Sequence, residues 1–562
     1  MKVTDYIIDY LMRKGTTCIF GYPGGVICHF IDSITKFKNV EAYITYNEQG
    51  AAFAACGYAQ ASHKLGVAFS TSGPGATNLV TGIANAYFDS IPVLFITGQV
   101  DTYALNNNKH IRQRGFQETD VVSMVKKMTK YAVRVDKKED IRYCLEKAVF
   151  EAFDSNPGPV LLDLPADVQR ADIDPDSLKG FMSQVQRDNV QCIDMVQKLL
   201  KESKRPVFLL GNGAKIANVS NEIKYLAEQW HIPVVTSLPA FDILPFDHPC
   251  YYGFIGTNGQ RYANFVFGKA DLVISIGSRL DIRQIGLQRD RYFKNKRLIR
   301  VDVDINQLNH CVVDNELKIN MDAKSFVSNL NHIANIDFSN WNDACRIIKQ
   351  KLIGYDDQDY NRIYTKLSSM IPDDSLITLD VGQNQIWFAQ SAHLNGQKVF
   401  MSAGHGSMGY SLPAAIGVCC ATGKEAFCFN GDGGIMMNLQ ELQFIKREQL
   451  PIKIICFNNH ALGMIRGFQE RNFQKNYSLT TESTGWGAPN FEKIAQAFDF
   501  PYIRIDRLSE IEKMKNLPAG SAFIEISYSG ETNLIPNFGK TDYIQDQLPE
   551  MDRELFDELM KL

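Results

Sequence analysis

Two segments decide the fold of this chain: Phe427-Cys428-Phe429-Asn430-Gly431-Asp432-Gly433-Gly434 and Ile454-Ile455-Cys456-Phe457-Asn458-Asn459. Each begins with a short apolar run that predicts a buried strand, and each ends in polar residues. Between them, residues 436–448 carry apolar side chains at helical spacing, which predicts a helix. The result is a strand–helix–strand unit of about 30 residues, whose two strands should lie parallel in one sheet.

The polar residues that follow these two strands should therefore lie side by side. Parallel strands end at the same edge of a sheet, where α/β proteins bind ligands. Asp432 and Asn459 would supply a carboxylate and an amide oxygen there, and Gly433 and Gly434 would let the backbone approach a phosphate. This pattern predicts a magnesium–diphosphate site. The competing interpretation is two unrelated turns, and either half of the pattern alone would be weak evidence.

The composition is that of an ordinary globular protein. The chain has 562 residues, of which 45% are hydrophobic and 22% charged, and a net charge of −4. No basic excess indicates nucleic acid or a membrane surface as a partner. Residues 1–15 predict an amphipathic helix rather than a signal peptide, and no apolar run is long enough for a membrane span. The 12 cysteines show no CxxC spacing, so we expect free thiols in a reducing cytoplasm.

Three α/β blocks follow one another along the chain. Their alternating strand-like and helical patterns predict an α/β protein with three doubly wound domains and mainly parallel sheets. We expect these domains at residues 1–175, 190–340 and 360–530. A polar stretch at 174–189 predicts a linker, and residues 531–562 predict a tail that ends in a short helix.

The first block holds a second group of candidate site residues. Tyr46-Asn47-Glu48 follows a predicted strand and opens a helix, so Glu48 should lie at a carboxyl edge of the sheet. Alone, Glu48 would be interpreted as a surface carboxylate near a helix N-terminus. However, glycine-rich turns at 21–25 and 71–78 share this edge and would let a flat ring approach the backbone.

These segments together resemble the acetohydroxyacid synthase (acetolactate synthase) family of thiamine diphosphate (ThDP) enzymes. The ThDP motif begins Gly-Asp-Gly and ends Asn-Asn, as residues 431–459 do. Similar segments at 115–120, 157–165, 380–383 and 406–413 occur in the family's order, so the resemblance covers nearly the whole chain. It implies a pyrimidine-binding, a central and a diphosphate-binding domain.

The resemblance also implies a role for each site residue. Glu48 would hydrogen-bond the aminopyrimidine ring, the Gly406 carbonyl would accept from its exocyclic amine, and Met408 would hold the cofactor bent. The other ThDP contacts would be Tyr22, Pro23, Gly24, Thr71, Pro74, Asn78, Gln383, Gly433 and Gly434, and the Mg²⁺ ligands would be Asp432, Asn459 and the Ala461 carbonyl. In this family the first and third domains complete a site across a subunit interface, which implies a homodimer or homotetramer.

The central block resembles the family's FAD-binding domain. Arg279, Asp281 and Arg283 are similar to the Arg-x-Asp-x-Arg element that holds FAD in these enzymes. The further contacts that the resemblance implies are Gly211, Gly213, Asp304 and Asp322, although a lone Gly-x-Gly is a weak signal. FAD performs no net redox chemistry in this family. A salt-bridged domain surface is the other interpretation of the same charges.

The chain departs from the family pattern at several positions. Two family histidines are replaced by Asn47 and Asn384, and the Met-His pair of the central domain is replaced by Phe254-Ile255. Phe468 stands where the family has a tryptophan that favours 2-oxobutyrate as acceptor, so more room is expected there. The residues that remain for a 2-oxo acid substrate are Phe116, Gln117 and Arg279.

These features predict a cytoplasmic ThDP- and Mg²⁺-dependent carboligase. Pyruvate would lose CO₂ and its hydroxyethyl unit would pass to a second carbonyl, giving 2-acetolactate for branched-chain amino acid biosynthesis when pyruvate is the acceptor. A nucleotide-linked keto sugar is the alternative acceptor, because residues 547–555 resemble the tails of related enzymes from polysaccharide gene clusters. A pyruvate oxidase or decarboxylase, and a non-catalytic scaffold, are further alternatives. Intact Glu48 and Asp432 argue against the scaffold, and no feature indicates a regulatory small subunit.

Overall fold

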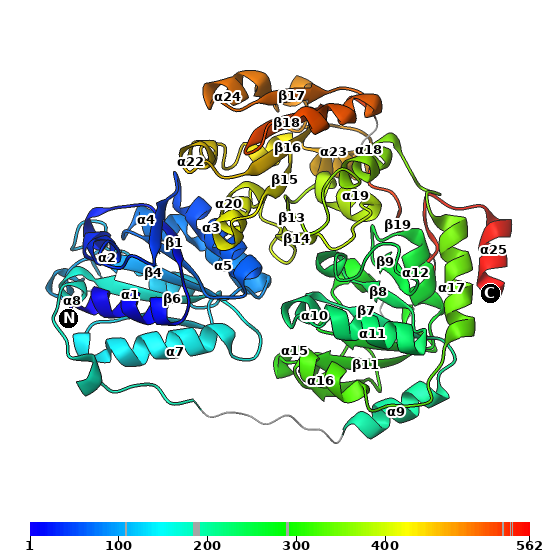
Figure 1. Cartoon of the computed structure of the whole chain (residues 1–562), viewed down its shortest axis with the longest axis horizontal. Helices are drawn as coiled ribbons and strands as arrows, with labels where there is room; N and C mark the ends of the chain where they lie inside the picture. The colour runs from blue at the N-terminus through cyan, green and yellow to red at the C-terminus, as the bar shows by residue number, and fades with distance from the viewer. Residues whose placement is uncertain (107–109, 184–191, 288–291, 531–532, 540, 542) are drawn as a thin grey trace.

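The computed structural model describes residues 1–106, 110–183, 192–287, 292–530, 533–539, 541 and 543–562. Three six-stranded parallel sheets with flanking helices follow one another along the chain (Figure 1). This architecture confirms the predicted α/β fold with three doubly wound domains. The predicted domain limits themselves stay a prediction.

The first sheet has the strand order β2-β1-β3-β4-β6-β5. Its strands are β1 (Cys18–Gly21), β2 (Glu41–Ile44), β3 (Gly66–Ser70), β4 (Val93–Gln99), β5 (Tyr131–Arg134) and β6 (Val160–Pro165). Its helices are α1 (Val3–Arg13), α2 (Cys28–Ile34), α3 (Glu48–Ser62), α4 (Pro74–Asn78), α5 (Val80–Phe88), α6 (Val121–Val125), α7 (Ile141–Phe153) and α8 (Ala166–Gln169). Helix α1 confirms the predicted amphipathic N-terminal helix. Helices α1 and α7 pack on one face of the sheet, and α3 and α5 pack on the other.

The second sheet has the strand order β12-β11-β10-β7-β8-β9. Its strands are β7 (Pro206–Leu210), β8 (Val234–Thr236), β9 (Tyr251–Phe254), β10 (Leu272–Ile276), β11 (Arg297–Asp302) and β12 (Leu317–Asn320). Its helices are α9 (Ile193–Glu202), α10 (Asn212–Ile216), α11 (Ser220–Trp230), α12 (Arg261–Lys269), α13 (Ile282–Ile285), α15 (Ile305–Asn309), α16 (Ala323–Leu330) and α17 (Ser339–Leu352). The predicted linker before it contains a 3₁₀ turn at Pro175–Ser177, and its residues 184–189 lie outside the described residues.

The third sheet has the strand order β14-β13-β15-β16-β18-β17. Its strands are β13 (Leu376–Leu379), β14 (Lys398–Met401), β15 (Ala426–Gly431), β16 (Ile452–Asn458), β17 (Tyr502–Ile505) and β18 (Ala522–Ser527). Its helices are α18 (Asp359–Ser368), α19 (Gln383–Ser391), α20 (Ser411–Thr422), α21 (Asp432–Ile435), α22 (Glu441–Arg447), α23 (Gly463–Asn472) and α24 (Phe491–Ala497). β15 and β16 pair in parallel over their length, as the strand–helix–strand pattern predicts.

The single helix predicted over residues 436–448 is wrong in extent. Only α22 (Glu441–Arg447) lies in this region, and turns at 436–440 separate it from α21, which ends at Ile435. Asn438 explains the break, because its side-chain amide donates to the Gly409 carbonyl (2.9 Å) and its own carbonyl accepts from the Glu441 N–H (3.0 Å). An asparagine that bonds outside the helix favours a turn over a continuous helix.

The first and third domains pack directly on each other through α3 and α20 (Figure 1). Both helices are rich in alanine and glycine. A Cβ at Gly57 would lie 2.2 Å from the Ala414 carbonyl oxygen, and a Cβ at Gly417 would lie 1.9 Å from the Ala54 carbonyl oxygen. Glycine is therefore required at both positions, and the two helices meet backbone to backbone.

The C-terminal tail belongs to the core of the central domain. Ile544, Met551, Phe556 and Leu559 are buried in the hydrophobic cluster of the second sheet, and the predicted final helix is α25 (Arg553–Lys561). A short antiparallel pair, β19 (Asn537–Phe538) with β20 (Gln547–Leu548), precedes it. None of the helices in the described ranges combines the length and apolar character needed to cross a bilayer.

Candidate functional site

Glu48 occupies the first position of α3, directly after the N-cap. Asn47 caps the helix by accepting a hydrogen bond from the Gln49 backbone N–H (2.8 Å), a role that asparagine fills well. Glu48 is only 8% exposed, and its Oε2 accepts from the Asn78 side-chain amide (2.9 Å). A Cβ at Gly75 would lie 3.1 Å from Glu48 Oε1. The structure therefore brings Glu48, Asn78 and the turn at 74–75 together.

Two more turns meet beside this pair. Because β1 and β3 are neighbours, the segments after them face each other, and a Cβ at Gly24 would lie 2.4 Å from Thr71 Cβ. A Cβ at Gly73 would lie 2.9 Å from Gln117 Cβ, so the loop that carries Phe116 and Gln117 rests on the second turn. Phe116 itself is 83% exposed. The predicted residues at this edge are Tyr22, Pro23, Gly24, Thr71, Pro74, Asn78, Phe116 and Gln117.

Asp432 and Asn459 lie together at the carboxyl edge of the third sheet, as the parallel pairing of β15 and β16 requires. The Ala461 backbone N–H donates to Asp432 Oδ2 (3.1 Å) and to Asn459 Oδ1 (3.3 Å), so the three predicted metal ligands form one group. The Asn459 amide donates to Gln383 Oε1 (3.1 Å). Burial raises the pKa of Asp432 to about 6, against the hydrogen bonds from Gly433 and Ala461 that lower it.

This group offers the oxygen donors that Mg²⁺ prefers: a carboxylate, a side-chain amide and a backbone carbonyl. Within the described ranges no cluster of three His, Cys, Asp or Glu side chains could hold a metal ion. A cation at the Asp432 group would thus depend on the ligand phosphates to complete its shell. The donor chemistry fits the predicted magnesium–diphosphate site.

Gly406 and Met408 lie on a loop beside that group. The Met408 methyl lies 3.7 Å from where a Cβ of Gly433 would stand, so the loop borders the diphosphate turn. Gly406 and Gly409 have φ values of 68° and 84°, which favour glycine. The Gly409 N–H donates to both oxygens of Asp380 (2.9 and 3.0 Å), which anchors the loop to the end of β13.

The first group of residues lies at the carboxyl edge of the first sheet, and the second group lies at the carboxyl edge of the third sheet. In the part of the chain that the structure describes, no hydrogen bond joins Glu48 or Asn78 to Met408 or to the Asp432 group. Phe468, on α23, contacts Phe473 (ring centroids 5.9 Å apart) and is 51% exposed. The structure does not bring it against Phe116 or Gln117 of the same chain.

A cavity of about 350 Å³ lies where the three domains meet. Of the residues predicted to hold FAD, Gly213, Arg279, Asp281, Arg283 and Asp322 line it. A Cβ at Gly213 would lie 2.8 Å from Gly277 Cα, so the two glycines pack backbone to backbone in the cavity wall and neither could carry a side chain. The absence of side chains there fits a nucleotide that approaches the backbone.

Gly211 and Asp304, also predicted to contact FAD, do not line this cavity. A Cβ at Gly211 would lie 2.0 Å from the Gly277 carbonyl oxygen, so Gly211 serves strand packing. Asp304 caps α15 through the Asn306 N–H (2.9 Å), and Asp302 lines the cavity instead. Asp281 and Asp322 also cap helices, α13 and α16, so part of the predicted pattern has a local structural cause.

Sequence reasoning missed three buried carboxylates around the site. One is Asp380, which accepts from the Gly409 N–H at the end of β13. Glu441 accepts from the Tyr46 N–H (2.9 Å), just before Glu48, and burial raises its pKa to about 7. Asp89 accepts from the Gly404 N–H (2.6 Å), just before Gly406, and burial raises its pKa to about 6. Asp380 had a signal, a charged residue directly after an apolar strand; the other two had none.

Three family models match the chain in order. They are the N-terminal TPP binding domain, the central domain and the C-terminal TPP binding domain of the thiamine pyrophosphate enzymes, at residues 1–124, 193–330 and 380–526. Thiamine pyrophosphate is a synonym of ThDP. The fold and these matches define a ThDP-dependent enzyme.

Named relatives narrow this class. The chain is 33% identical to acetolactate synthase isozyme 2 large subunit of Escherichia coli (strain K12), over 91% of this chain and 92% of the relative. It is 33% identical to the acetolactate synthase large subunit of Lactococcus lactis, over 90% and 88%, and 34% identical to a probable acetolactate synthase large subunit of Methanocaldococcus jannaschii, over 100% and 98%. The chain belongs to the acetolactate synthase large-subunit family of ThDP enzymes and is an acetolactate synthase-like transferase.

Proposed function

We propose that this enzyme decarboxylates pyruvate and transfers the hydroxyethyl unit to a second carbonyl, forming 2-acetolactate when that carbonyl belongs to pyruvate. The observation that carries the proposal is the presence of two groups in one family member: the Glu48–Asn78 pair and the Asp432–Asn459–Ala461 group. Bound ThDP supplies the acidic carbon at which a 2-oxo acid is decarboxylated. The protein supplies binding, orientation and proton transfer.

Each residue then has a task that its geometry suits. Glu48, held by the Asn78 amide, would exchange a proton with a ring nitrogen of the aminopyrimidine. The Gly406 carbonyl would accept from the exocyclic amine, and Met408 would support the bend of the cofactor. Asp432, Asn459 and the Ala461 carbonyl would hold Mg²⁺, which neutralises the diphosphate. Gln383 and the amides of Gly433 and Gly434 would bind the diphosphate oxygens.

The separation of the two groups supports a homodimer or homotetramer. If a second copy supplied the missing half, Glu48 of one protomer would face Met408 and Asp432 of the other. The exposed aromatic side chains of Phe116 and Phe468 would then be covered. A cytoplasmic location and a role in branched-chain amino acid synthesis remain predictions, and no sequence feature indicates a regulatory small subunit.

FAD is the proposed occupant of the cavity between the domains. Its support is the lining by Gly213, Arg279 and Asp322 and the absence of side chains at the glycines. The purified protein should be yellow, and the flavin should show no net reduction during pyruvate turnover. A colourless, fully active protein that ignores added FAD would leave helix capping as the role of these acids. Flavin bleaching by pyruvate would favour an oxidase.

The acceptor is the least constrained part of the proposal. Phe116, Gln117 and Arg279 would contact a 2-oxo acid, and Phe468 would leave more room than tryptophan. We therefore expect little preference for 2-oxobutyrate over pyruvate. A nucleotide-linked keto sugar is the second candidate, favoured by the half-exposed Phe468 and by the tail at 547–555.

One product analysis separates these candidates. Holoenzyme with ThDP, Mg²⁺ and pyruvate should form 2-acetolactate, and an equimolar mixture with 2-oxobutyrate should give no strong bias. Phe468→Trp should raise the 2-oxobutyrate preference by about 10–200-fold, the range of a lost apolar contact. If pyruvate alone gives no product and pyruvate with a keto sugar nucleotide does, the keto sugar proposal replaces the acetolactate proposal. No turnover with any acceptor would refute both.

A further inference from the structure

Asp380 is a carboxylate without a cation in the interior of the third domain. It is completely buried at the end of β13, and no ion pair in the described ranges involves it. Burial raises its pKa to about 7. A buried carboxylate is costly unless hydrogen bonds satisfy its oxygens, and here backbone N–H groups do so.

Those donors come from the loop that carries Gly406 and Met408. The Gly409 N–H lies 2.9 and 3.0 Å from the two Asp380 oxygens, and the Tyr410 N–H lies 3.2 Å from Oδ1. The Val381 N–H adds a third donor to Oδ1 (3.0 Å). The carboxylate thus binds the loop on the side that follows Met408.

The same carboxylate touches the diphosphate turn. A Cβ at Gly434 would lie 1.9 Å from Asp380 Oδ2, so the turn packs directly on the carboxylate and tolerates no side chain. The backbone of Asp380 is also hydrogen-bonded. Its N–H donates to the Phe429 carbonyl of β15 (2.9 Å), and its carbonyl accepts from the Asn384 side-chain amide (2.8 Å). Asp380 therefore connects three segments: 380–384, 406–410 and 432–434.

We infer that Asp380 is a positioning residue that sets the Met408 loop relative to the diphosphate turn, and thereby the bend of bound ThDP. The inference rests on the proposed function, because it assigns the loop to the pyrimidine end and the turn to the diphosphate end of the cofactor. Met408 lies only one residue from the anchored Gly409, and its methyl reaches the turn at Gly433. A displacement of the loop would therefore move the reacting end of the cofactor while Asp432 and Gln383 still bind its diphosphate.

Asp380→Asn tests this with almost no change in shape. An amide can accept from Gly409 or Tyr410 with its oxygen, but its NH₂ group would face another N–H. We expect turnover to fall by about 10- to 100-fold, the cost of a misplacement of about 1 Å. ThDP affinity, measured by titration of the apoprotein, should change by less than about fivefold. The near-ultraviolet circular dichroism bands of the bound aminopyrimidine should also change.

Asp271→Asn is the matched control. Asp271 also accepts backbone N–H groups, from Lys204 (2.9 Å) and Arg205 (3.1 Å), but it lies in the central domain away from the site. It should leave turnover and the dichroism bands as in the wild type. If Asp380→Asn does not fold, Asn438→Ser decides, since Asn438 holds the Gly409 carbonyl from the other side (2.9 Å).

The outcomes separate the inference from the proposed function. Unchanged turnover and dichroism in Asp380→Asn, or in Asn438→Ser if that variant is needed, would overturn the positioning role. Loss of ThDP affinity in proportion to the loss of turnover would also overturn it, because a positioning role predicts that affinity is kept while turnover falls. If wild-type protein binds ThDP but does not turn over pyruvate, the proposed reaction fails, and the dichroism and affinity measurements still test Asp380.

Discussion

Glu48, Asp380 and Asp432 are buried carboxylates that form no ion pair in the described part of the chain. Glu48 receives one amide N–H from Asn78, and Asp432 receives backbone N–H groups from Gly433 and Ala461. A carboxylate that accepts only one or two hydrogen bonds keeps lone pairs free for a ligand. Glu48 and Asp432 are thus available to a ring nitrogen and to a cation, while Asp380 is saturated by the protein.

Glu48→Gln should slow proton exchange at the reactive carbon of bound ThDP. Glutamine keeps the shape and a contact with Asn78 but cannot shuttle a proton. Positioned proton transfer contributes about 10²–10⁴-fold, so exchange and turnover should fall by a factor in this range while ThDP still binds. Hydrogen–deuterium exchange at the carbon, followed by NMR after acid quench, measures this. Glu139→Gln, at an exposed residue, is the control. Near-wild-type exchange in Glu48→Gln would contradict the assignment.

Asp432→Ala should weaken ThDP binding because it removes the only charged protein ligand of the proposed Mg²⁺ shell. Loss of even an outer-shell partner costs about 10- to 100-fold in metal affinity, so at least this loss is expected. Excess Mg²⁺ should restore binding only in part. Titration of the apoprotein with ThDP at several Mg²⁺ concentrations measures it, and Asp499→Ala on the surface of the same domain is the control. An unchanged ThDP affinity would mean that the group does not hold the metal.

The sequence could place Asp432 beside Asn459 because one strand–helix–strand unit contains both, and parallel pairing follows from local pattern alone. It could not show what Asp380 contacts. Its partners Gly409 and Gly434 come from segments that become neighbours only when β13 enters the sheet between β14 and β15. The prediction of Asp304 as a flavin contact stays a prediction: β11 ends at Asp302, and Asp304, two residues further on, caps α15, a boundary that the apolar run alone does not fix.

Helices α3 and α20 form the joint between the two cofactor-binding domains. Their contact brings backbone against backbone at Gly57 and Gly417, and α3 starts at Glu48 while α20 follows the Met408 loop. A close helix pair with small side chains is rigid, because packed interiors leave little room for rearrangement. This helix contact therefore fixes the position of Glu48 relative to the Met408 loop of the same chain. The sequence contained the small residues but did not indicate which helices they bring together.

Gly417→Ala should destabilise this joint. The new methyl would lie 1.9 Å from the Ala54 carbonyl oxygen, which cannot move without shifting α3. Overpacking of this kind costs about 1–3 kcal/mol and should lower the apparent melting temperature. Gly467→Ala in α23 is the control, since its methyl would meet Arg471 at 3.5 Å and Asn533 at 4.0 Å, both ordinary contacts, and helix propensity favours alanine by about 1 kcal/mol. Equal melting temperatures for Gly417→Ala and wild type would show that the helices can separate.

Asp163, on β6, should make the stability of the first domain depend on pH. It is buried beside β4, where it accepts from Thr97 Oγ1 (2.7 Å) and Gln99 Nε2 (3.0 Å), and burial raises its pKa to about 7. The unfolded pKa is about 3.9, so between these values the folded state holds a proton that the unfolded state lacks. The stabilisation that this extra proton gives the folded state is fully present below about pH 4 and is lost as pH rises through about 7.

Asp163→Asn should therefore flatten the pH profile. The free energy of unfolding of the wild type should fall, relative to the variant, by on the order of a few kcal/mol from about pH 4 to pH 8. Urea unfolding across this range measures the difference. Asp314→Asn, at an exposed carboxylate, should leave the wild-type slope intact. A variant with the same slope as the wild type would contradict the raised pKa.

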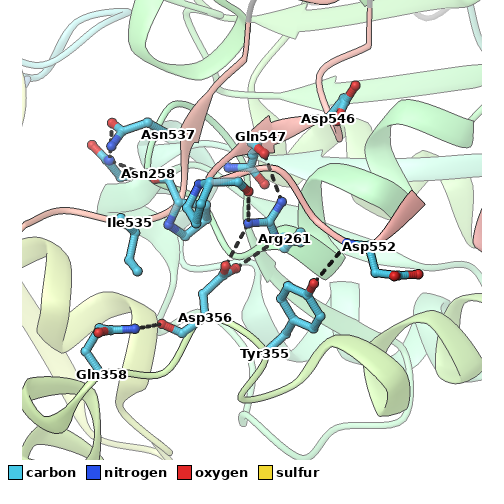
Figure 2. Close-up of polar contacts among 12 residues, drawn as sticks. Asn258, Arg261, Tyr355, Asp356, Gln358, Ile535, Asn537, Asp546, Gln547 and Asp552 are labelled. Carbon is cyan, nitrogen blue, oxygen red and sulfur yellow. Dashed lines mark hydrogen bonds and ion pairs between the residues drawn. The ribbon is translucent and has the colours of Figure 1, made fainter. Parts of the chain in front are cut away.

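The central domain borders both neighbouring domains at the cavity and also holds the C-terminal tail. Its sheet borders the cavity, and its core is completed by the tail. Figure 2 shows where the tail binds the central domain: the buried Arg261 guanidinium lies between Asp356 and two tail carbonyls. Sequence reasoning predicted the tail and its last helix, but burial of the tail in another domain depends on a partner surface that is assembled from distant segments.

Arg261→Met should release this tail and, with it, the cavity wall. Arg261 forms a bidentate pair with Asp356 (2.9 and 2.7 Å) and donates to the carbonyls of Gln547 and Pro549 (3.0 Å each), and it is 1% exposed. Removing one partner of a buried pair costs about 3–5 kcal/mol. We expect a lower apparent melting temperature and faster proteolytic cleavage of the tail.

The same variant connects the tail to the proposed flavin. Asn258 lines the cavity, and its side-chain amide donates to the Pro536 carbonyl (3.0 Å) and to Asn537 Oδ1 (2.9 Å) (Figure 2). A loosened tail should therefore raise the rate of flavin loss on gel filtration. Arg346→Met in α17 of the same domain is the control, because its pair with Asp343 is more than half exposed on both sides and such pairs contribute about 0–1 kcal/mol. Rapid tail cleavage with unchanged flavin retention would show that the tail stabilises the fold but does not hold the cavity wall.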